Sequence, residues 1–268
     1  MKVFITGITG TLGTEVTRIL LEKKCKVIGY SRDEQKQRNF PYKNVTMYLG
    51  DVRDKDRLLE ATRGVDVIFH FAALKCVDSL EANPEESVST NILGTQNVLY
   101  SQRMNKIEKV CFTSTDKAVQ PINVYGMCKS ISERLVLRNH KNVVCRYGNV
   151  IGSRGSVVPM FKNTLEKENK VYITDNSMTR FWIRIEVAAK FVVHCAFAEY
   201  GLCIPPMKAS SVNQIAFCIA KSMSIEDFDV EYTGIRPGEK IHENIDSNTN
   251  SLECDQYTDI EIMDLIRW

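Results

Sequence analysis

The sequence predicts an α/β protein in which a doubly wound parallel sheet carries a smaller α/β cap. Three observations support this fold class. Over the first 150 residues, short apolar runs alternate with longer amphipathic ones, as in a parallel sheet covered by helices on both faces. A glycine-rich turn directly follows the first apolar run. After Tyr147 the alternation loosens, and we therefore expect the cap there.

The expected elements follow in chain order. The strands of the sheet are the runs KVFIT, KVIGY, VTMYL, DVIFHF, KVCFTS and NVVCRY. Helices are expected between them at residues 11–24, 54–63, 84–104 and 124–140, and in the cap at 158–168, 185–200 and 212–223. No linker-like or low-complexity tract interrupts the chain. We expect a first domain at residues 1–150 and a cap formed mainly by residues 151–268, with some later segments returning to the first domain.

The composition narrows the classes of partner. The 35 basic and 33 acidic residues leave a net charge of +2, which gives no reason to expect nucleic acid or a membrane surface. An acidic small molecule is not excluded as a partner, because its binding needs only local positive charge. The nine cysteines form no C-x-x-C pair, as expected for reduced thiols. The chain shows no signal-peptide layout and no apolar run near the ~20 residues that span a bilayer, so we expect a cytoplasmic protein. The four histidines lack metal-ligand spacing; no metal site is predicted, and His70 is expected in the core.

The glycine-rich stretch ITGITGTLG predicts a dinucleotide-binding turn. Its G-x-x-G-x-x-G spacing suits a tight turn, close approach of the backbone to a pyrophosphate, and close packing of the helix on the strand. The N–H groups at the start of the helix then face the phosphates. This context makes the expected fold Rossmann-type. The predicted contacts are Gly7, Thr9, Gly10, Thr11, Leu12 and Gly13.

The end of the second strand, GYSRDE, favours NADP over NAD. Ser31 and Arg32 suit a 2′-phosphate, because a guanidinium holds its oxygens in a fork. Asp33 follows, and a carboxylate at this place suits NAD instead, so the alternative stays open, as does a simple solvated charge run. Further contacts are expected beside the adenine and the nicotinamide ribose. They are Asp51 and Val52 in GDVRD, and Ala72, Ala73 and Lys75 in FAALK.

Four residues in TSTDKAVQPINVYGMCK are candidates for the chemistry. Tyr125 and Lys129 share one face of a predicted helix, and the lysine cation is expected to lower the pKa of the phenol. The phenolate can then take a proton from an alcohol. Asp116 and Lys117 place an acid and a base side by side, which simple alcohol oxidation does not need. The alternative for this second pair is a surface turn ahead of Pro121.

Four longer stretches carry a resemblance to a known family. STDKAVQPINVYGMCK, RYGNVIGSRGSVVP, MTRFWI and GIRPGEKIHE are similar to the extended short-chain dehydrogenase/reductases, and within them to the inverting UDP-N-acetylglucosamine (UDP-GlcNAc) 4,6-dehydratases. The similarity covers nearly the whole chain. It implies conversion of UDP-GlcNAc to a 4-keto-6-deoxy sugar nucleotide with inversion at C5, and a bound NADP that is not consumed. It also implies dimers, often assembled further.

The resemblance implies a role for the second pair. Oxidation at C4 acidifies the C5 proton, which a base removes while an acid protonates the departing 6-hydroxyl. By resemblance Asp116 is the acid and Lys117 the base, where glucose-type 4,6-dehydratases carry a glutamate. A free lysine is mostly charged at pH 7, a gap of about 3.4 pKa units or ~4.6 kcal/mol. Burial and nearby positive charge are expected to lower this pKa, and the protonation states stay open. We expect Lys117→Ala to retain the fold, because a loop residue carries little core packing.

The resemblance also implies contacts with the nucleotide sugar. Arginine suits the diphosphate and glutamate a ribose hydroxyl, although each arginine could equally form a surface ion pair. Two departures from the family stand out. Cys76 occupies a position where the family tends to have histidine, and the chain stops at Trp268, earlier than most relatives, which predicts a short cap. The implied contacts are Lys75, Asn149, Arg154, Val157, Val158, Pro159, Thr174, Met178, Arg180, Arg236 and Glu239.

Two other functions remain open on the sequence alone. One is another NADP-dependent nucleotide-sugar enzyme, an epimerase or a reductase, against which Asp116 and Lys117 argue because neither reaction eliminates water. The other is a non-catalytic NADP-binding regulator, against which the presence of Tyr125 argues.

Overall fold

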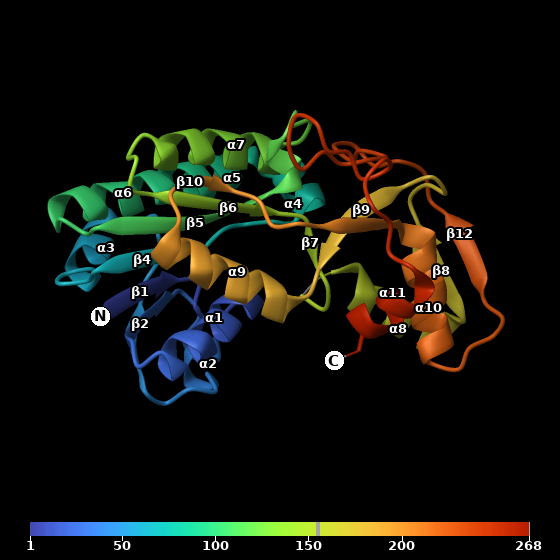
Figure 1. The fold of residues 1–268 in the computed structure, drawn as a ribbon, viewed down its shortest axis with the longest axis horizontal. Coiled ribbons are helices and arrows are strands. Elements are labelled where there is room, and N and C mark those ends of the chain that lie inside the picture. Colours follow the sequence, from blue (N-terminus) through green and yellow to red (C-terminus); the bar gives the residue numbers. More distant parts are fainter. Residues whose placement is uncertain (154–155, 268) are drawn as a thin grey trace.

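The computed structural model describes residues 1–153 and 156–267. Its largest feature is a seven-stranded parallel sheet of strand order β3-β2-β1-β4-β5-β6-β10 (Figure 1). The strand order reverses between β1 and β4, and in such sheets ligands bind beyond the carboxyl ends of the strands. The strands are β1 (Lys2–Thr6), β2 (Lys26–Ser31), β3 (Val45–Leu49), β4 (Val67–His70), β5 (Lys109–Thr115), β6 (Val143–Tyr147) and β10 (Gly201–Cys203).

Helices cover both faces of this sheet. On one face, α1 (Thr11–Glu22) and α9 (Ile185–Ala198) bury their apolar side chains against the strands. On the other face lie α3 (Lys55–Ala61), α6 (Gly94–Met104) and α7 (Val124–Leu137). Figure 1 shows the sheet edge-on between these two layers. The central strands β4 and β5 are therefore buried along their whole length, which explains their near-continuous apolar runs.

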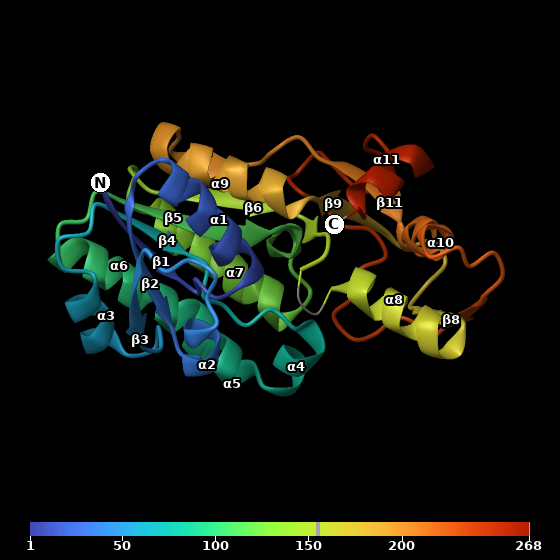
Figure 2. The same cartoon turned by 90° about the horizontal axis from the view of Figure 1, so that it is seen from below.

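The cap lies beyond the carboxyl edge of the sheet (Figures 1 and 2). It has a core of its own, in which Phe161, Trp182 and Ile215 are buried together. A three-stranded sheet of order β11-β9-β7 and a two-stranded sheet β12-β8 form its β-structure. Its elements are β7 (Asn149–Val150), α8 (Val157–Glu168), β8 (Lys170–Ile173), β9 (Thr179–Ile183), β11 (Lys208–Ser211), α10 (Val212–Ser222), β12 (Asp229–Tyr232) and α11 (Asp259–Leu265).

The structure confirms the predicted fold class and the six predicted strands. The single helix expected at 84–104 is wrong in detail, because α5 (Pro84–Ser87) and α6 are joined by a π-helical segment, Val88–Leu93. The sequence analysis missed β10 and three short helices, α2 (Glu34–Arg38), α4 (Val77–Ala82) and α11. These elements are too short for a periodic apolar pattern to stand out. Two elements that follow residue 150 join the first domain: α9 packs on the first sheet, and β10 pairs with β6 in it.

Among the described residues, no helix combines the length and the apolar character needed to cross a membrane.

Candidate active site

The glycine-rich turn connects β1 to α1 at the centre of the carboxyl edge. Gly7 has a positive φ of 70°, and a Cβ there would lie 2.8 Å from the backbone nitrogen of Ala72. A Cβ on Gly13 would lie 2.5 Å from the carbonyl oxygen of Ile8. Only glycine therefore lets the turn lie against the loop after β4 and lets α1 pack on the turn. No side chain caps the start of α1 at Gly10, and a helix N-terminus attracts an anion, so the turn fits a dinucleotide pyrophosphate.

A buried hydrogen-bond chain fixes the loop FAALK beside this turn. The Thr95 hydroxyl donates to the carbonyl of Asn91 (2.6 Å), so it accepts from Nε2–H of His70 (3.0 Å). The Nδ1 of His70 then accepts from the hydroxyl of Thr6 (2.7 Å), whose oxygen accepts from the backbone N–H of Ala72 (3.2 Å). Burial lowers the pKa of His70 to about 3, so the ring is neutral. His70 is the core residue that the sequence predicted.

The residues after β2 fall into two groups. Asp33 caps α2: its carboxylate accepts from the backbone N–H of Lys36 (2.9 Å) and pairs with the ammonium of the same residue (2.8 Å). Ser31 is buried at the end of β2. Arg32 is exposed, and its guanidinium lies 3.5 Å from the carboxylate of Asp51. Asp33, the acid that kept NAD open as an alternative, is therefore the N-cap of α2.

The Tyr–Lys helix α7 begins against the residues that follow β5. Asn123 caps it by accepting from the backbone N–H of Gly126 (2.7 Å), and the carboxylate of Glu81 accepts from the N–H of Val124 (2.7 Å). A Cβ on Gly126 would collide with the carbonyl of Lys117. Glycine at this position therefore lets the first turn of α7 touch the residues that follow β5.

Tyr125 and Lys129 occupy neighbouring turns of α7, as predicted. The Lys129 ammonium is buried, donates to the carbonyl of Thr113 (2.8 Å) and lies 4.3 Å from the ring centroid of Phe112. Burial lowers the pKa of Lys129 to about 8. Burial also raises the pKa of Tyr125 to about 12, an effect that the Lys117 cation only partly opposes. The expected lowering of the phenol pKa by Lys129 is therefore not seen in this arrangement.

Asp116 and Lys117 form an ion pair inside the protein. They lie in a single 3₁₀ turn, Asp116–Ala118, that follows β5 directly. Nζ of Lys117 is 3.0 Å from Oδ1 of Asp116, which also accepts from the hydroxyl of Thr115 (2.9 Å). Asp116 is fully buried, and its Oδ2 has no hydrogen-bond partner among the described residues. This geometry excludes the alternative of a plain surface turn.

The structure adds a carboxylate that the sequence analysis did not single out. Oε1 of Glu243 lies 3.4 Å from Nζ of Lys117, and Oδ1 of Asn149 lies 3.3 Å from it. Glu243 is 2% exposed. Burial lowers the pKa of Lys117, but Asp116 and Glu243 together outweigh burial and raise it, contrary to the expected direction. Glu243 is the last residue of the quoted stretch GIRPGEKIHE, and an acid there was the available signal.

Of the other predicted sugar-nucleotide contacts, Arg180 and Met178 are buried in the cap. The guanidinium of Arg180 donates to the carbonyls of Thr179 (2.8 Å), Ile241 (2.9 Å) and Lys240 (2.8 Å). Arg180 therefore holds the chain segment that leads to Glu243. Met178 packs in the cap core, as does Val158 on α8.

The remaining predicted contacts lie nearer the surface. Arg236 is exposed and pairs with Asp78 on α4 (3.0 Å). Oε2 of Glu239 is buried and has no hydrogen-bond partner within the described ranges. Lys75 is exposed in the loop after β4. Val157, Pro159 and Thr174 are partly buried, and Arg154 lies outside the described residues.

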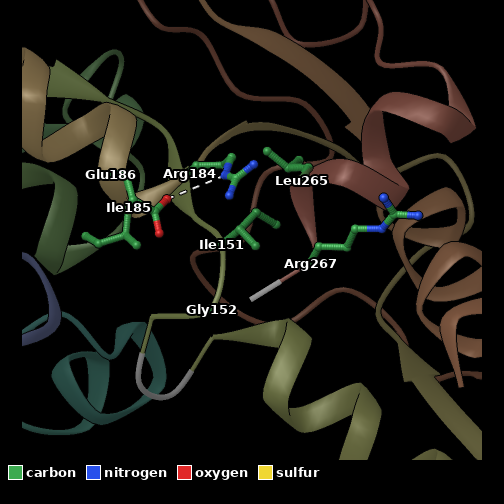
Figure 3. Close-up of a pocket in the computed structure, with 7 residues that line it drawn as sticks. All are labelled: Ile151, Gly152, Arg184, Ile185, Glu186, Leu265 and Arg267. Carbon is green, nitrogen blue, oxygen red and sulfur yellow. Dashed lines mark ion pairs between the residues drawn. The ribbon is translucent and has the colours of Figure 1, made fainter.

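Two hollows elsewhere contain none of the predicted site residues. A cavity of about 50 Å³ lies between α9, α11 and the loop after β7, where Arg184 pairs with Glu186 (3.5 Å; Figure 3). That volume holds one or two waters, not a nucleotide sugar. A broader groove of about 850 Å³ runs along α6 and α7. The residues predicted for the chemistry, Asp116, Lys117, Tyr125 and Lys129, instead lie at or next to the carboxyl end of β5.

A parallel sheet of this order with a glycine-rich first turn and a Tyr-x-x-x-Lys helix at its carboxyl edge defines an extended short-chain dehydrogenase/reductase. Within that class, the chain belongs to the polysaccharide biosynthesis protein family, whose model matches residues 3–264.

Several known proteins resemble the chain over most of its length. It is 41% identical to a Campylobacter jejuni (strain 81-176) UDP-N-acetylglucosamine 4,6-dehydratase (inverting), over 93% of this chain and 78% of the relative. It is 38% identical to a Rickettsia bellii (strain RML369-C) UDP-glucose 4-epimerase, over 94% of this chain and 79% of the relative. The crystal structure of Pen from Bacillus thuringiensis superposes with a TM-score of 0.87 at 36% identity, covering 91% of this chain and 80% of that one.

Proposed function

We propose that the chain is a UDP-GlcNAc 4,6-dehydratase that inverts C5 and gives UDP-2-acetamido-2,6-dideoxy-β-L-arabino-hexos-4-ulose. The observation that carries this proposal is the buried Asp116–Lys117 pair beside the Tyr125 helix. It supplies one acid and one base beyond those that alcohol oxidation needs. The similarity to the inverting Campylobacter enzyme supports the same assignment.

The cofactor that we propose is NADP. When bound, a nicotinamide dinucleotide accepts the hydride from C4 and returns one to C6. The glycine turn would hold its pyrophosphate at the start of α1, because no side chain caps that helix end at Gly10. Arg32 is exposed and would meet a 2′-phosphate, while the carboxylate of Asp33 is engaged in the cap of α2 and paired with the ammonium of Lys36. Mass spectrometry of the ligand released from denatured protein tests the choice, and recovery of NAD alone would refute it.

Tyr125 and Lys129 serve the oxidation and the reduction. We propose that Tyr125 takes the proton of the 4-hydroxyl as the hydride leaves C4. Its pKa of about 12 in this structure means that the phenol needs further positive charge to ionise at neutral pH. The Lys129 ammonium, one turn along α7, is positioned to supply such charge, since its single carbonyl partner leaves it two further N–H groups.

Asp116 and Lys117 serve the elimination. The C4 ketone acidifies the C5 proton, which passes to Nζ of Lys117, and the C5–H electron pair becomes the C5=C6 double bond. The C6–O bond breaks, and the oxygen takes a proton from Asp116 and leaves as water. Lys117 thus ends as an ammonium and Asp116 as a carboxylate, which is the ion pair that the structure shows. Moving one proton from Lys117 to Asp116, 3.0 Å away, restores this pair. When the hydride returns to C6, C5 takes a proton from solvent, and Tyr125 gives solvent the proton that it took from the 4-hydroxyl, so the count of protons closes.

The contacts with the nucleotide sugar are proposed at the facing edge of the cap. Arg236 is a candidate for the diphosphate; Arg154, outside the described residues, is proposed for it on the resemblance alone. Glu239 is a candidate for the ribose, because its Oε2 is buried without a hydrogen-bond partner among the described residues. Asn149, whose Oδ1 accepts from Nζ of Lys117, is a further candidate for a contact with the sugar. Val157, Val158, Pro159, Thr174, Met178, Arg180 and Lys75 complete the proposed set.

An epimerase is the second candidate, favoured by the 38% identity to the Rickettsia enzyme. Incubation with UDP-GlcNAc in heavy water, followed by NMR, separates the two. The dehydratase gives a 6-deoxy-4-keto product with deuterium at C5, and the L-arabino configuration at the earliest times. An epimerase gives a product that retains its 6-hydroxyl, and a D-xylo product at the earliest times would contradict inversion at C5. A cytoplasmic location and a homo-oligomer remain predictions from the sequence.

A further inference from the structure

We infer that Glu243 is a positioning residue of the elimination site: it fixes Nζ of Lys117 and holds in place the single proton that Asp116 and Lys117 share. The inference rests on the proposed function. Neither the sequence pattern nor the resemblance assigned Glu243 a role; the contacts around Lys117 point to one.

The ammonium of Lys117 lies among three acceptors. They are Oδ1 of Asp116 at 3.0 Å, Oδ1 of Asn149 at 3.3 Å and Oε1 of Glu243 at 3.4 Å. An ammonium has three N–H groups and no lone pair, so three acceptors match its charged form. Glu243 therefore provides one of three anchors for the atom that takes the C5 proton.

The backbone around Glu243 is held from both sides. Its N–H donates to the hydroxyl of Ser251 (2.9 Å), and its carbonyl accepts from the N–H of Ser251 (2.8 Å). Arg180 fixes the preceding carbonyls of Lys240 and Ile241. The Glu243 carboxylate is thus brought to Lys117 by a fixed segment rather than by a free loop. An acid that served only to cover the surface would not be 2% exposed at such an anchor.

Charge explains what the second carboxylate does. Elimination needs one proton between Asp116 and Lys117, because the acid must have it before the 6-hydroxyl leaves. If that proton were lost to solvent, two carboxylates would remain beside a neutral amine. Glu243 opposes this loss, because it adds negative charge 3.4 Å from Nζ. Without Glu243, the proton would leave at a lower pH, and the site would lose its acid.

The other charged groups that face Lys117 limit the effect. Arg180 on β9 opposes protonation of Lys117, and the Lys117 cation in turn favours ionisation of Tyr125 on α7. Lys240 lies 3.5 Å from Oε2 of Glu243 and donates to the carbonyl of Val119 (2.7 Å). Lys240 partly neutralises Glu243. Removing Glu243 should therefore lower the pKa of Lys117, and removing Lys240 should raise it.

The experiment compares Glu243→Gln, Glu243→Asp and Lys240→Met with the wild type. Deuterium incorporation at C5 of UDP-GlcNAc product is measured by NMR across pH. Glu243→Gln should shift the alkaline limb of the profile to lower pH and slow incorporation about 10–100-fold near that limb. Glu243→Asp should restore the wild-type position in part, because it keeps the charge. Lys240→Met should shift the limb to higher pH. The exposed Glu231→Gln, which loses its surface pair with Lys170, is the matched control and should shift nothing.

A second readout does not depend on turnover. The ¹⁵N resonance of the Lys117 ε-nitrogen, assigned by its absence in Lys117→Met, is titrated in the purified protein with its bound dinucleotide. Its pKa should fall in Glu243→Gln and rise in Lys240→Met. An unchanged titration and an unchanged pH profile in both variants would overturn the role of Glu243. If the wild type gives no C5-labelled product, the proposed function fails, and the titration still decides whether Glu243 holds the proton.

Discussion

Replacing Lys117 by methionine tests whether the buried ion pair contributes to stability as well as to catalysis. The substitution keeps the length of the side chain and removes its charge. Asp116 is fully buried and Glu243 is 2% exposed, so both carboxylates lose the ammonium that lies within 3.4 Å of them. Removing one partner of a buried ion pair typically destabilises a protein by about 3–5 kcal/mol.

The protonation equilibrium gives the same magnitude independently. The folded variant avoids two unpaired buried charges at least cost when one of the two carboxyl groups takes a proton. At pH 7, protonating a carboxyl with an ordinary pKa of about 3.9 costs roughly 3.1 units, or about 4 kcal/mol. At pH 5 the cost falls to about 1.5 kcal/mol. We therefore expect Lys117→Met to lose about 4 kcal/mol of unfolding free energy at pH 7 and much less at pH 5.

The sign of the pH dependence follows from linkage. In the variant, the carboxyl pKa is raised in the folded state above its unfolded value. Its penalty is absent below the unfolded pKa and grows as the pH rises, so the difference from the wild type should widen from pH 5 to pH 7. The sequence predicts that Lys117→Ala retains the fold, because a loop residue carries little core packing; the buried ion pair adds a charge contribution that packing does not include.

Urea unfolding followed by circular dichroism, at one fixed dinucleotide concentration, measures the effect at both pH values. Lys170→Met is the matched control, because Lys170 pairs with Glu231 on the exposed strand β12. It should change the unfolding free energy little and show no added pH slope. Equal stability of Lys117→Met and wild type at pH 7, or a difference that widens toward pH 5, would refute the reasoning.

Three further predictions concern the cofactor turn, the core histidine and the oxidation step. Tyr125→Phe should lower turnover by about 10²–10⁴-fold and show no absorbance of a reduced dinucleotide. In Lys117→Met the hydride should still leave C4, and that absorbance should accumulate if the equilibrium of the C4 oxidation allows; equal absorbance in both variants would contradict the division of roles. His70 has a pKa of about 3 in the folded state against about 6.5 in the unfolded state, so the unfolded chain binds the proton more tightly. The unfolding free energy should therefore decrease as the pH falls below about 6.5, by roughly 2 kcal/mol between pH 7 and pH 5. His70→Gln should remove most of this pH dependence of the unfolding free energy. Gly13→Ala places a Cβ 2.5 Å from the Ile8 carbonyl oxygen and should destabilise the protein by about 1–3 kcal/mol and reduce the dinucleotide recovered by mass spectrometry; full occupancy and unchanged stability would show that the turn can relax.

The sequence alone determined the features that depend on neighbouring residues. The period of the apolar runs predicted the six strands, and the glycine spacing predicted the turn between β1 and α1. The four-residue spacing of Tyr125 and Lys129 placed both on one helix. Each of these signals arises within a few residues of chain, where backbone geometry converts spacing directly into position.

Only the tertiary structure decided how charges are balanced in the site. Glu243 reaches Lys117 because Arg180 and Ser251 fix a segment from the far end of the cap, and no local pattern encodes that approach. The tertiary structure also decided the pKa of Lys117, which the sequence predicted to be lowered. Burial alone would lower it, but two buried carboxylates raise it, because Coulomb interactions depend on distances in space and on the exclusion of water rather than on separation along the chain.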